Sequence, residues 1–251
     1  MSNMLHYLAT NPITEAPAML FRQLFDPVTS TYTYLVADLQ THAAILIDPV
    51  LEQHERDLQL LKELGLSLRY CLETHIHADH ITGAGKLRAV TGCKNIVPNL
   101  SEVDCADQLL RDGTTLVIDG ITVLALATPG HTDSHMAYLI NGTHLLTGDS
   151  LLIRGCGRTD FQSGDPGVLF DSITEKIWTL PDTTLIYPGH DYRGHTVSSV
   201  GEEKRYNPRF VGKSRQDFIA LMDGLNLPNP QKIMEAVPAN QKCGDLAATS
   251  A

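Results

Sequence analysis

The residues of this chain that are best suited to chemistry lie in one short stretch, Thr74-His75-Ile76-His77-Ala78-Asp79-His80. Three imidazoles and a carboxylate within seven residues do not suit a packed core, because each buried polar group needs a hydrogen-bonding partner. Imidazole and carboxylate groups are, however, common ligands of zinc and iron in proteins. The stretch therefore predicts a metal site, with a solvated loop as the alternative.

Three more residues of these types stand at the ends of later apolar segments. They are His131, Asp149 and His190, and each follows a run of residues that is typical of a strand. Loops at one edge of a sheet are where proteins commonly build their sites. Four strand-like segments that each finish at a histidine or an aspartate favour the metal site over the solvated loop.

The strands that must position these residues are visible as alternating or apolar runs. The turn dipeptides Asp119-Gly120 and Asn141-Gly142 each separate two such runs, and they supply the positive φ that two-residue hairpin loops require. A strand ending at Leu72 leads directly into the histidine cluster. We predict strands at residues 31–39, 43–47, 68–72, 115–118, 121–127, 137–140, 143–147 and 184–187.

Helical periodicity separates several of these strands. Leu58, Leu61 and Leu64 share one helical face, and Gly65 follows as a terminating glycine. We predict helices at residues 52–64, 83–90, 168–180, 198–205 and 215–221. This alternation predicts a single α/β domain spanning residues 1–251, with two mixed sheets and helices outside. Residues 1–20 are expected to be a loose lead-in, and residues 226–251 an extended tail that contains three prolines.

Composition and charge exclude several functions. The net charge of -10 disfavours a nucleic-acid partner, because no basic stripe is present to neutralise phosphates. No apolar run approaches the roughly 18–20 residues of a membrane span, so no membrane interaction is expected. The first 20 residues support neither secretory nor mitochondrial targeting. The five cysteines are odd in number and form no C-x-x-C pair, which predicts free thiols in a reducing cytoplasm.

The order of the polar residues resembles that of the metallo-β-lactamase superfamily. Asp48, the H-x-H-x-D-H cluster at 75–80, His131, Asp149 and His190 match its five motifs in sequence. The resemblance implies an αβ/βα sandwich of two mixed β-sheets flanked by helices, with a metal site at one edge.

Within this superfamily the chain resembles the persulfide dioxygenases, and the likeness extends over nearly the whole chain. The matching segments are residues 47–52, 77–83, 151–162, 188–192, 207–209 and 237–240. The resemblance implies a non-haem iron(II) dioxygenase that oxidises the sulfane sulfur of glutathione persulfide with O2. Its products would be sulfite and glutathione. The resemblance also suggests a homodimer.

By this resemblance, His75, His131 and Asp149 bind one Fe(II) per chain. Two imidazoles and a carboxylate form a facial triad that leaves positions open for the persulfide and O2. The remaining polar residues of the motifs are implied to orient ligands and water through hydrogen bonds: His77, Asp79, His80 and His190. Asp48 is expected to be either another such orienting residue or a residue at the end of a sheet, rather than a ligand.

Residues beyond the triad have weaker assignments. Tyr192 and Arg209 match positions that would bind glutathione, the arginine by holding a carboxylate. Arg154 and Arg158 are expected either to steady the loop at 155–162 through Asp160 or Asp165 or to contact substrate. The other histidines are predicted to be surface or loop residues: His42, His54, His135, His144 and His195.

Two rival functions remain open at this stage. A glyoxalase II-type hydrolase of glutathione thioesters would need a second metal, and every ligand type for it is present. The segment 151–162 and the lack of a long helical C-terminal domain favour the oxygenase. A metal-binding sensor or sulfur carrier without turnover is disfavoured, because pure binding does not need open coordination positions.

Overall fold

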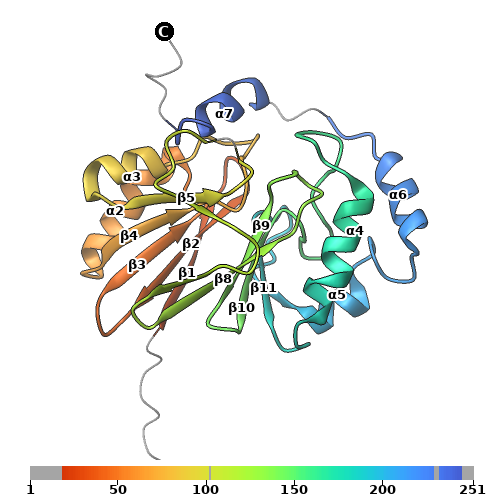
Figure 1. The fold of residues 1–251 in the computed structure, drawn as a ribbon, viewed down its shortest axis with the longest axis horizontal. Helices are drawn as coiled ribbons and strands as arrows, with labels where there is room; N and C mark the ends of the chain where they lie inside the picture. The colour runs from red at the N-terminus through yellow and green to blue at the C-terminus, as the bar shows by residue number, and fades with distance from the viewer. Residues whose placement is uncertain (1–18, 102, 229–231, 245–251) are drawn as a thin grey trace, which may run out of the picture.

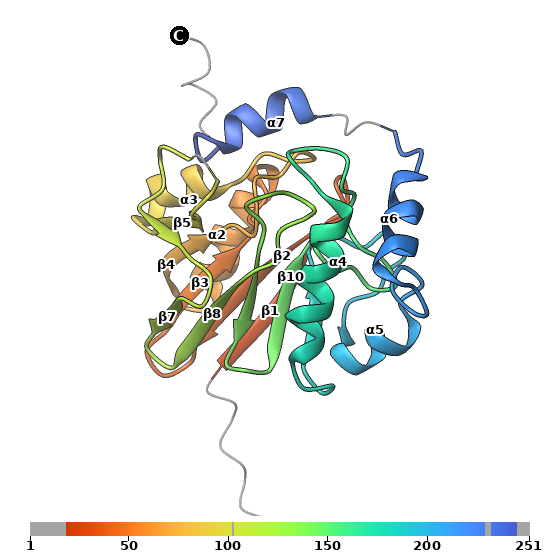
Figure 2. The same ribbon diagram turned by 45° about the vertical axis from the view of Figure 1, so that its right-hand side comes forward.

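Two six-stranded sheets lie face to face in the computed structural model, which describes residues 19–101, 103–228 and 232–244 (Figure 1). The strand orders are β1-β2-β3-β4-β5-β6 and β12-β11-β10-β9-β8-β7. Each sheet contains parallel and antiparallel pairs. Helices cover the outer faces of both sheets, as Figure 2 shows from a second direction. The predicted α/β sandwich of two mixed sheets flanked by helices is therefore confirmed.

The first sheet is built from the N-terminal part of the chain. Its strands are β1 (Met19–Asp26), β2 (Thr31–Asp38), β3 (Ala43–Ile47), β4 (Ser67–Leu72), β5 (Lys94–Pro98) and β6 (Gln108–Leu110). The parallel crossovers from β3 to β5 pass through η1 (Leu51–Gln53), α2 (His54–Glu63) and α3 (Ala84–Thr91). Every residue of β2 and β3 is buried, because the second sheet covers one face and α2 and α3 cover the other.

The second sheet follows in the chain and ends with a short edge strand. Its strands are β7 (Thr115–Ile118), β8 (Ile121–Ala127), β9 (Met136–Ile140), β10 (His144–Gly148), β11 (Leu185–Pro188) and β12 (Ser198–Ser199). Its outer face is covered by α4 (Pro166–Glu175), η2 (Ile177–Thr179), α5 (Val200–Tyr206) and α6 (Arg215–Asp223). At the predicted Asn-Gly turn, Asn141 and Gly142 have φ angles of 46° and 69°.

Side chains from the inner faces of both sheets form the main core. Tyr34 and Ile45 of the first sheet pack in one cluster with Val123 and Tyr138 of the second. Tyr34 also donates a hydrogen bond of 2.6 Å to the carbonyl of Pro188, at the end of β11. This contact ties the two sheets together at the end where the polar motif residues lie. No helix among the described residues is long and apolar enough to cross a bilayer.

The C-terminal prediction was wrong in two respects. The expected extended tail contains a helix, α7 (Ile233–Asn240), which carries Pro238 in its interior. Burial of Ala236 and Ala239 against Ile81 stabilises a helix that the prolines alone did not indicate. Cys243, expected to be a free thiol, forms a disulfide with Cys105. The sequence could not reveal this pairing, because it requires α7 to dock on the first sheet.

The N-terminal lead-in lies mostly outside the described residues, which begin at position 19. Met19 and Leu20, predicted to belong to it, are instead the first residues of β1. The strands β1, β5 and β6 were not predicted from the sequence. Each is less apolar or shorter than the central strands, and each is defined by pairing with a neighbour.

Candidate metal centre

The motif residues meet at one end of the sandwich, just beyond the ends of four strands. The histidine cluster follows β4, His131 follows β8, Asp149 follows β10 and His190 follows β11. The ligand atoms of His75, His131 and Asp149 all lie within 4.8 Å of one another. His131 Nε2 is 3.7 Å from Asp149 Oδ2. The three residues implied as ligands by the family resemblance are thus brought together.

Asp48 fixes the orientation of His75 by accepting two hydrogen bonds from Thr74. Thr74 donates its hydroxyl proton to Asp48 Oδ2 at 2.9 Å, and its backbone N–H donates to Asp48 Oδ1 at 2.7 Å. The same hydroxyl oxygen lies 2.9 Å from His75 Nδ1, so it accepts the Nδ1 proton. His75 Nε2 therefore carries the free lone pair. Burial lowers the pKa of His75 well below its ordinary value, which keeps the ring neutral.

His131 is oriented by the backbone of the loop after β10. Its Nδ1 donates to the carbonyl of Arg158 at 2.7 Å, which leaves Nε2 as the ligand atom. Gly157 N donates to the carbonyl of Asp149 at 2.7 Å. A Cβ atom on Gly157 would lie 2.7 Å from His131 Nδ1, so only glycine allows this close approach.

Asp149 is held by two histidines. Its Oδ1 accepts a hydrogen bond from His190 Nδ1 at 2.7 Å, and its backbone N–H donates to His135 Nε2 at 3.1 Å. Oδ2 remains directed toward His131. Burial alone would raise the pKa of Asp149, but the neighbouring His190 lowers it below its ordinary value. The carboxylate therefore stays ionised.

His135 is a loop residue, as one of the two predicted alternatives states, but it does not lie at the surface. Its side chain is only 1% exposed, and its Nδ1 donates to Thr128 Oγ1 at 2.9 Å. Burial lowers the pKa of His135 to about 3, so the neutral ring can accept the Asp149 N–H. Its position directly before the fully apolar strand β9 was the available signal of burial.

The remaining motif residues form a hydrogen-bonded group beside the triad. His190 Nε2 lies 2.9 Å from Asp79 Oδ2, which is also 3.0 Å from His80 Nδ1. Burial would lower the pKa of His190, but Asp149 and Asp79 raise it well above its ordinary value. His190 is thus a protonated bridge between two carboxylates, with both ring nitrogens engaged.

His77 lies between this group and two further carboxylates, and one of its ring nitrogens is within 4.8 Å of ligand atoms of Asp79 and His80. Its Nε2 lies 3.1 Å from Asp48 Oδ1 and 3.4 Å from Glu73 Oε2. These carboxylates raise the pKa of His77 well above its ordinary value, although burial opposes them. Asp48 therefore contacts His77 and Thr74 together, and it acts through them.

A cavity of about 430 Å³ opens beside the triad. Apolar and aromatic side chains form much of its wall, with two polar side chains from the loop after β10 and one after β11: Leu152, Phe161, Leu227, Pro228, Arg158, Gln162 and Tyr192. Tyr192 is 73% exposed, and its ring stacks on His190 with centroids 6.1 Å apart. Arg209, the other residue expected to bind glutathione, does not line this cavity.

Two arginines steady the wall of the cavity. Arg158 makes a bidentate ion pair with Asp160, at 2.6 and 2.7 Å, and donates to the carbonyl of Pro228 at 2.7 Å. Arg154 pairs with Glu202 and with the fully buried Glu203. The expected partner Asp160 is thus observed for Arg158.

The donor set fits a transition-metal ion. Both imidazoles use Nδ1 for protein hydrogen bonds and keep Nε2 free, while Asp149 uses Oδ1 and keeps Oδ2 free. Three donors that converge while their other heteroatoms are occupied form a preorganised site. Two imidazoles and one carboxylate suit iron or zinc.

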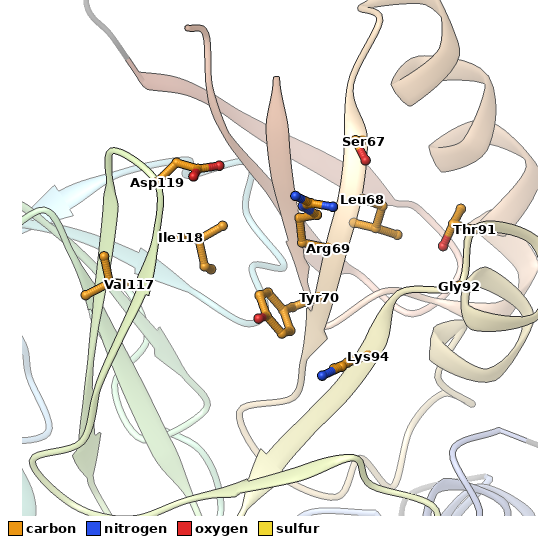
Figure 3. A pocket seen from close by; sticks show the side chains of 10 residues that line it. All are labelled: Ser67, Leu68, Arg69, Tyr70, Thr91, Gly92, Lys94, Val117, Ile118 and Asp119. Atoms are coloured by element: carbon orange, nitrogen blue, oxygen red, sulfur yellow. The ribbon is translucent and has the colours of Figure 1, made fainter. Parts of the chain in front are cut away.

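A separate cavity of about 360 Å³ lies at the opposite end of the strands (Figure 3). It is lined by the start of β4, by Lys94 and by the turn between β7 and β8, including Asp119. Neither a histidine nor a cysteine is among its described lining residues, and its polar side chains are those of Ser67, Arg69, Tyr70, Thr91, Lys94 and Asp119. We therefore assign the chemistry to the cavity beside the triad.

Comparisons with known proteins agree with this geometry. Residues 26–190 match the family model of the metallo-beta-lactamase superfamily. The chain is 51% identical over 231 residues to "Persulfide dioxygenase ETHE1, mitochondrial" of Bos taurus, covering 91% of this chain and 90% of that protein. The crystal structure of ETHE1 from Myxococcus xanthus has 53% identity and a TM-score of 0.87, covering 90% of this chain and 99% of that one.

A more distant solved structure is also similar to this chain. TTHA1623, solved in a di-iron-bound form, has 25% identity and a TM-score of 0.62, covering 75% of this chain and 98% of that one. The match to the family model and the identity to the bovine and bacterial proteins extend over the strands and loops that build the centre. The chain belongs to the persulfide dioxygenase family of the metallo-beta-lactamase superfamily.

Proposed function

We propose that this protein is a persulfide dioxygenase that uses one iron(II) ion, bound by His75, His131 and Asp149, to oxidise glutathione persulfide. The observation that carries the proposal is the convergence of three free donor atoms beside a cavity with apolar walls. The dioxygenase relatives at about half identity support the same reaction class. In the balanced reaction, one persulfide, one O2 and one water give one thiol, one sulfite and two protons.

Bound iron(II) would supply the electron transfer that joins O2 to the terminal sulfur. The chain's own residues would bind the persulfide and orient it. Phe161 and Leu227 present apolar surface that excludes water from the sulfur. Tyr192, at the rim of the cavity, offers a hydroxyl to the glutathione portion. Arg158 lines the same cavity and adds a positive charge, partly balanced by Asp160, that favours an anionic persulfide.

The hydrogen bonds of His190 support one metal rather than two. A second ion in the hydrolase arrangement would need His190, Asp79 and His80 as ligands. Both nitrogens of His190 are engaged by carboxylates, and Asp79 accepts from two histidines. Binding a second ion through these three residues would require these bonds to break, although His77, Asp79 and His80 also have ligand atoms within 4.8 Å of one another. We infer one iron per chain. Iron and zinc measured per chain, on protein purified without added metal, test this stoichiometry.

Oxygen uptake tests the reaction itself. Protein reconstituted with iron(II) should consume O2 when glutathione persulfide is added, and sulfite should appear in equal amount. Reduced glutathione without the sulfane sulfur should cause no uptake, and hydrogen sulfide should be a poor substrate. Absence of oxygen uptake together with rapid hydrolysis of lactoylglutathione would replace this proposal with the glyoxalase II-type hydrolase.

Location and assembly are finer points of the proposal. We propose a cytoplasmic location, while its bovine relative is named as mitochondrial. We also propose a homodimer, from the family resemblance. Cell fractionation with an antibody to the chain tests the first, and light scattering during gel filtration tests the second.

A further inference from the structure

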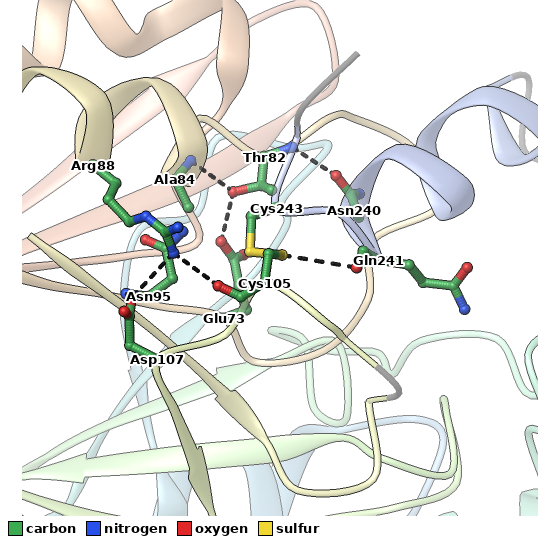
Figure 4. Close-up of a disulfide and its surroundings, with 10 residues drawn as sticks. All are labelled: Glu73, Thr82, Ala84, Arg88, Asn95, Cys105, Asp107, Asn240, Gln241 and Cys243. Carbon is green, nitrogen blue, oxygen red and sulfur yellow. Dashed lines mark hydrogen bonds and ion pairs between the residues drawn. A yellow bond between two sulfur atoms is a disulfide. The ribbon is translucent and has the colours of Figure 1, made fainter. Parts of the chain in front are cut away.

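A disulfide joins the C-terminal end of the chain to the first sheet, outside the metal centre (Figure 4). Cys105 lies in the connection between β5 and β6, and Cys243 follows α7, 138 residues later. The carbonyl of Cys243 accepts a hydrogen bond of 2.9 Å from Gly85 N in α3. A Cβ atom on Gly85 would lie 2.6 Å from that carbonyl oxygen, so the two segments are in close contact.

The helix secured by this disulfide braces the loop that carries the motif histidines. Asn240, the last residue of α7, donates from Nδ2 to the carbonyls of His77 and His80, both at 2.9 Å. Its Oδ1 accepts from Thr82 N at 2.8 Å. The side chain is only 4% exposed. One amide group thus fixes three backbone positions of residues 77–82, and it stays in place only while α7 stays docked.

A cavity of about 610 Å³ lies against the disulfide and has a cationic lining. Both cysteines line it, together with Lys86, Arg88 and Lys242, and no carboxylate lines it among the residues that the structure describes. Arg88 donates to the carbonyl of Cys105 at 2.8 Å and to the nearby Asp107 at 3.1 Å. The balance of charge favours an anionic ligand next to the sulfur atoms.

The wall of this cavity also contains a buried amide without a partner. Asn95 is 1% exposed, and neither its Oδ1 nor its Nδ2 has a hydrogen-bond partner among the described residues. Such groups are rare because they cost free energy. A ligand with its own amide groups would supply the missing hydrogen-bond partners of Asn95, which lines the cavity. The cavity therefore suits an anionic ligand that contains peptide bonds.

We propose that this cavity binds an anionic peptide thiol of the glutathione class, which exchanges with the Cys105–Cys243 disulfide and releases the hold of α7 on residues 77–82. Cys105 is the more exposed of the two cysteines, so it is the sulfur that the first thiolate attacks. The attack forms a mixed disulfide at Cys105 and frees the Cys243 thiolate. A second thiolate then frees Cys105 and leaves as the oxidised disulfide of the peptide thiol. The reverse sequence closes the bond again.

Rates of disulfide reduction test the ligand class. The oxidised full chain is treated with glutathione or with the cationic thiol cysteamine, and free Cys105 and Cys243 are measured by alkylation and mass spectrometry. Each rate is divided by the rate of the same thiol with a small neutral disulfide. We expect the normalised rate to be several-fold higher for glutathione. Equal normalised rates for the two thiols would overturn the binding of an anionic ligand. Absence of the Cys105–Cys243 disulfide from the purified chain would overturn the proposed exchange.

Charge-reversal variants locate the effect in the cavity. Lys86→Glu should lower the normalised rate for glutathione several-fold and leave that for cysteamine equal or higher. Lys62→Glu, on the exposed face of α2 and outside the cavity lining, is the matched control and should change neither. An equal effect of both variants would contradict binding in this cavity.

Hydrogen exchange tests the connection to the motif loop. Reduction should speed amide exchange of residues 77–82 several-fold, while residues 136–140 in β9 stay unchanged. Asn240→Ala should speed exchange of the same residues even when the disulfide is intact. Unchanged exchange at 77–82 after complete reduction would overturn the proposed release. Neither readout depends on turnover, so both remain valid if the proposed reaction is wrong.

Discussion

The two sheets contribute to the metal centre in different ways. The first sheet offers three histidines and an aspartate from one loop after β4, but only His75 among them belongs to the converging triad. The second sheet offers one residue from each of three loops, and two of these, His131 and Asp149, complete the triad. The histidine cluster after β4 thus supplies one donor to the triad and several residues around it, whereas residues that are far apart in the sequence supply the other two donors.

The two halves are also held in place by different groups. In the first half, side chains orient the loop: Asp48 acts through Thr74, and Asn240 reaches in from α7. In the second half, two histidine side chains hold Asp149, but the backbone orients His131, which donates to a carbonyl, and Gly157 approaches both ligands closely. The first half should therefore be sensitive to loss of a side chain, and the second to the addition of one.

The largest effect is expected from the triad itself, where both halves should behave alike. His75→Ala, His131→Ala and Asp149→Ala should each lose the bound iron, because three ligands leave no redundancy. Iron per chain is measured by elemental analysis, with circular dichroism to verify folding. Full iron content in any folded variant would remove that residue from the ligand set.

Adding one methyl group tests the backbone-held half. Gly157→Ala should lose most iron affinity, because its Cβ would lie 2.7 Å from His131 Nδ1 and closer still to the carbonyl of Asp149. Gly155→Ala is the matched control, since its Cβ would meet only Leu152, at an ordinary 3.7 Å. Competition with a chelator gives the affinities. Equal losses in the two variants would contradict the role of close packing at Gly157.

Removing one hydroxyl tests the half held by side chains. Thr74→Val eliminates the acceptor for His75 Nδ1, and we expect iron affinity to fall by about 10–100-fold. Thr74→Ser keeps the hydroxyl and should retain affinity close to that of the parent protein. If valine and serine gave the same affinity, the bond from Thr74 to His75 would have no part in orienting the ligand.

The smallest effect on metal content is expected from the residues around the triad. His80→Ala and His190→Ala should keep most of the iron, yet lose about 10–100-fold in oxygen uptake with persulfide. Metal content and uptake are measured on the same preparation. Loss of one of two bound ions would instead support a binuclear centre, and would revise the difference drawn here between donors and surroundings.

Much of the fold was predictable because local chemistry decided it. The Asn141-Gly142 turn requires positive φ angles that few other residues adopt, and the hairpin around it formed as expected. The strands at β2, β3, β8 and β9 are rich in apolar and β-branched residues. Strands β5 and β6 escaped prediction because pairing with their neighbours, rather than their own composition, makes them strands.

The same distinction between local and long-range causes applies to the candidate site. The cluster at 75–80 was visible because its residues are adjacent in sequence, and the order of His131, Asp149 and His190 indicated the superfamily. The burial of His135 had only an indirect signal, its place directly before the apolar strand β9, because burial depends on how β9 packs. The absence of Arg209 from the cavity lining also required the folded loops.

The amino-acid sequence by itself determined the donor types, their order and the strands that end beside them, since these follow from local composition and spacing. Only the tertiary structure decided which nitrogen of each histidine is free, because that depends on partners as remote as Arg158 and Asp48. It also decided that Cys105 meets Cys243 and that Asn240 reaches the motif loop. Contacts between residues more than a hundred positions apart exist only after the sheets and α7 have packed, so no local pattern records them.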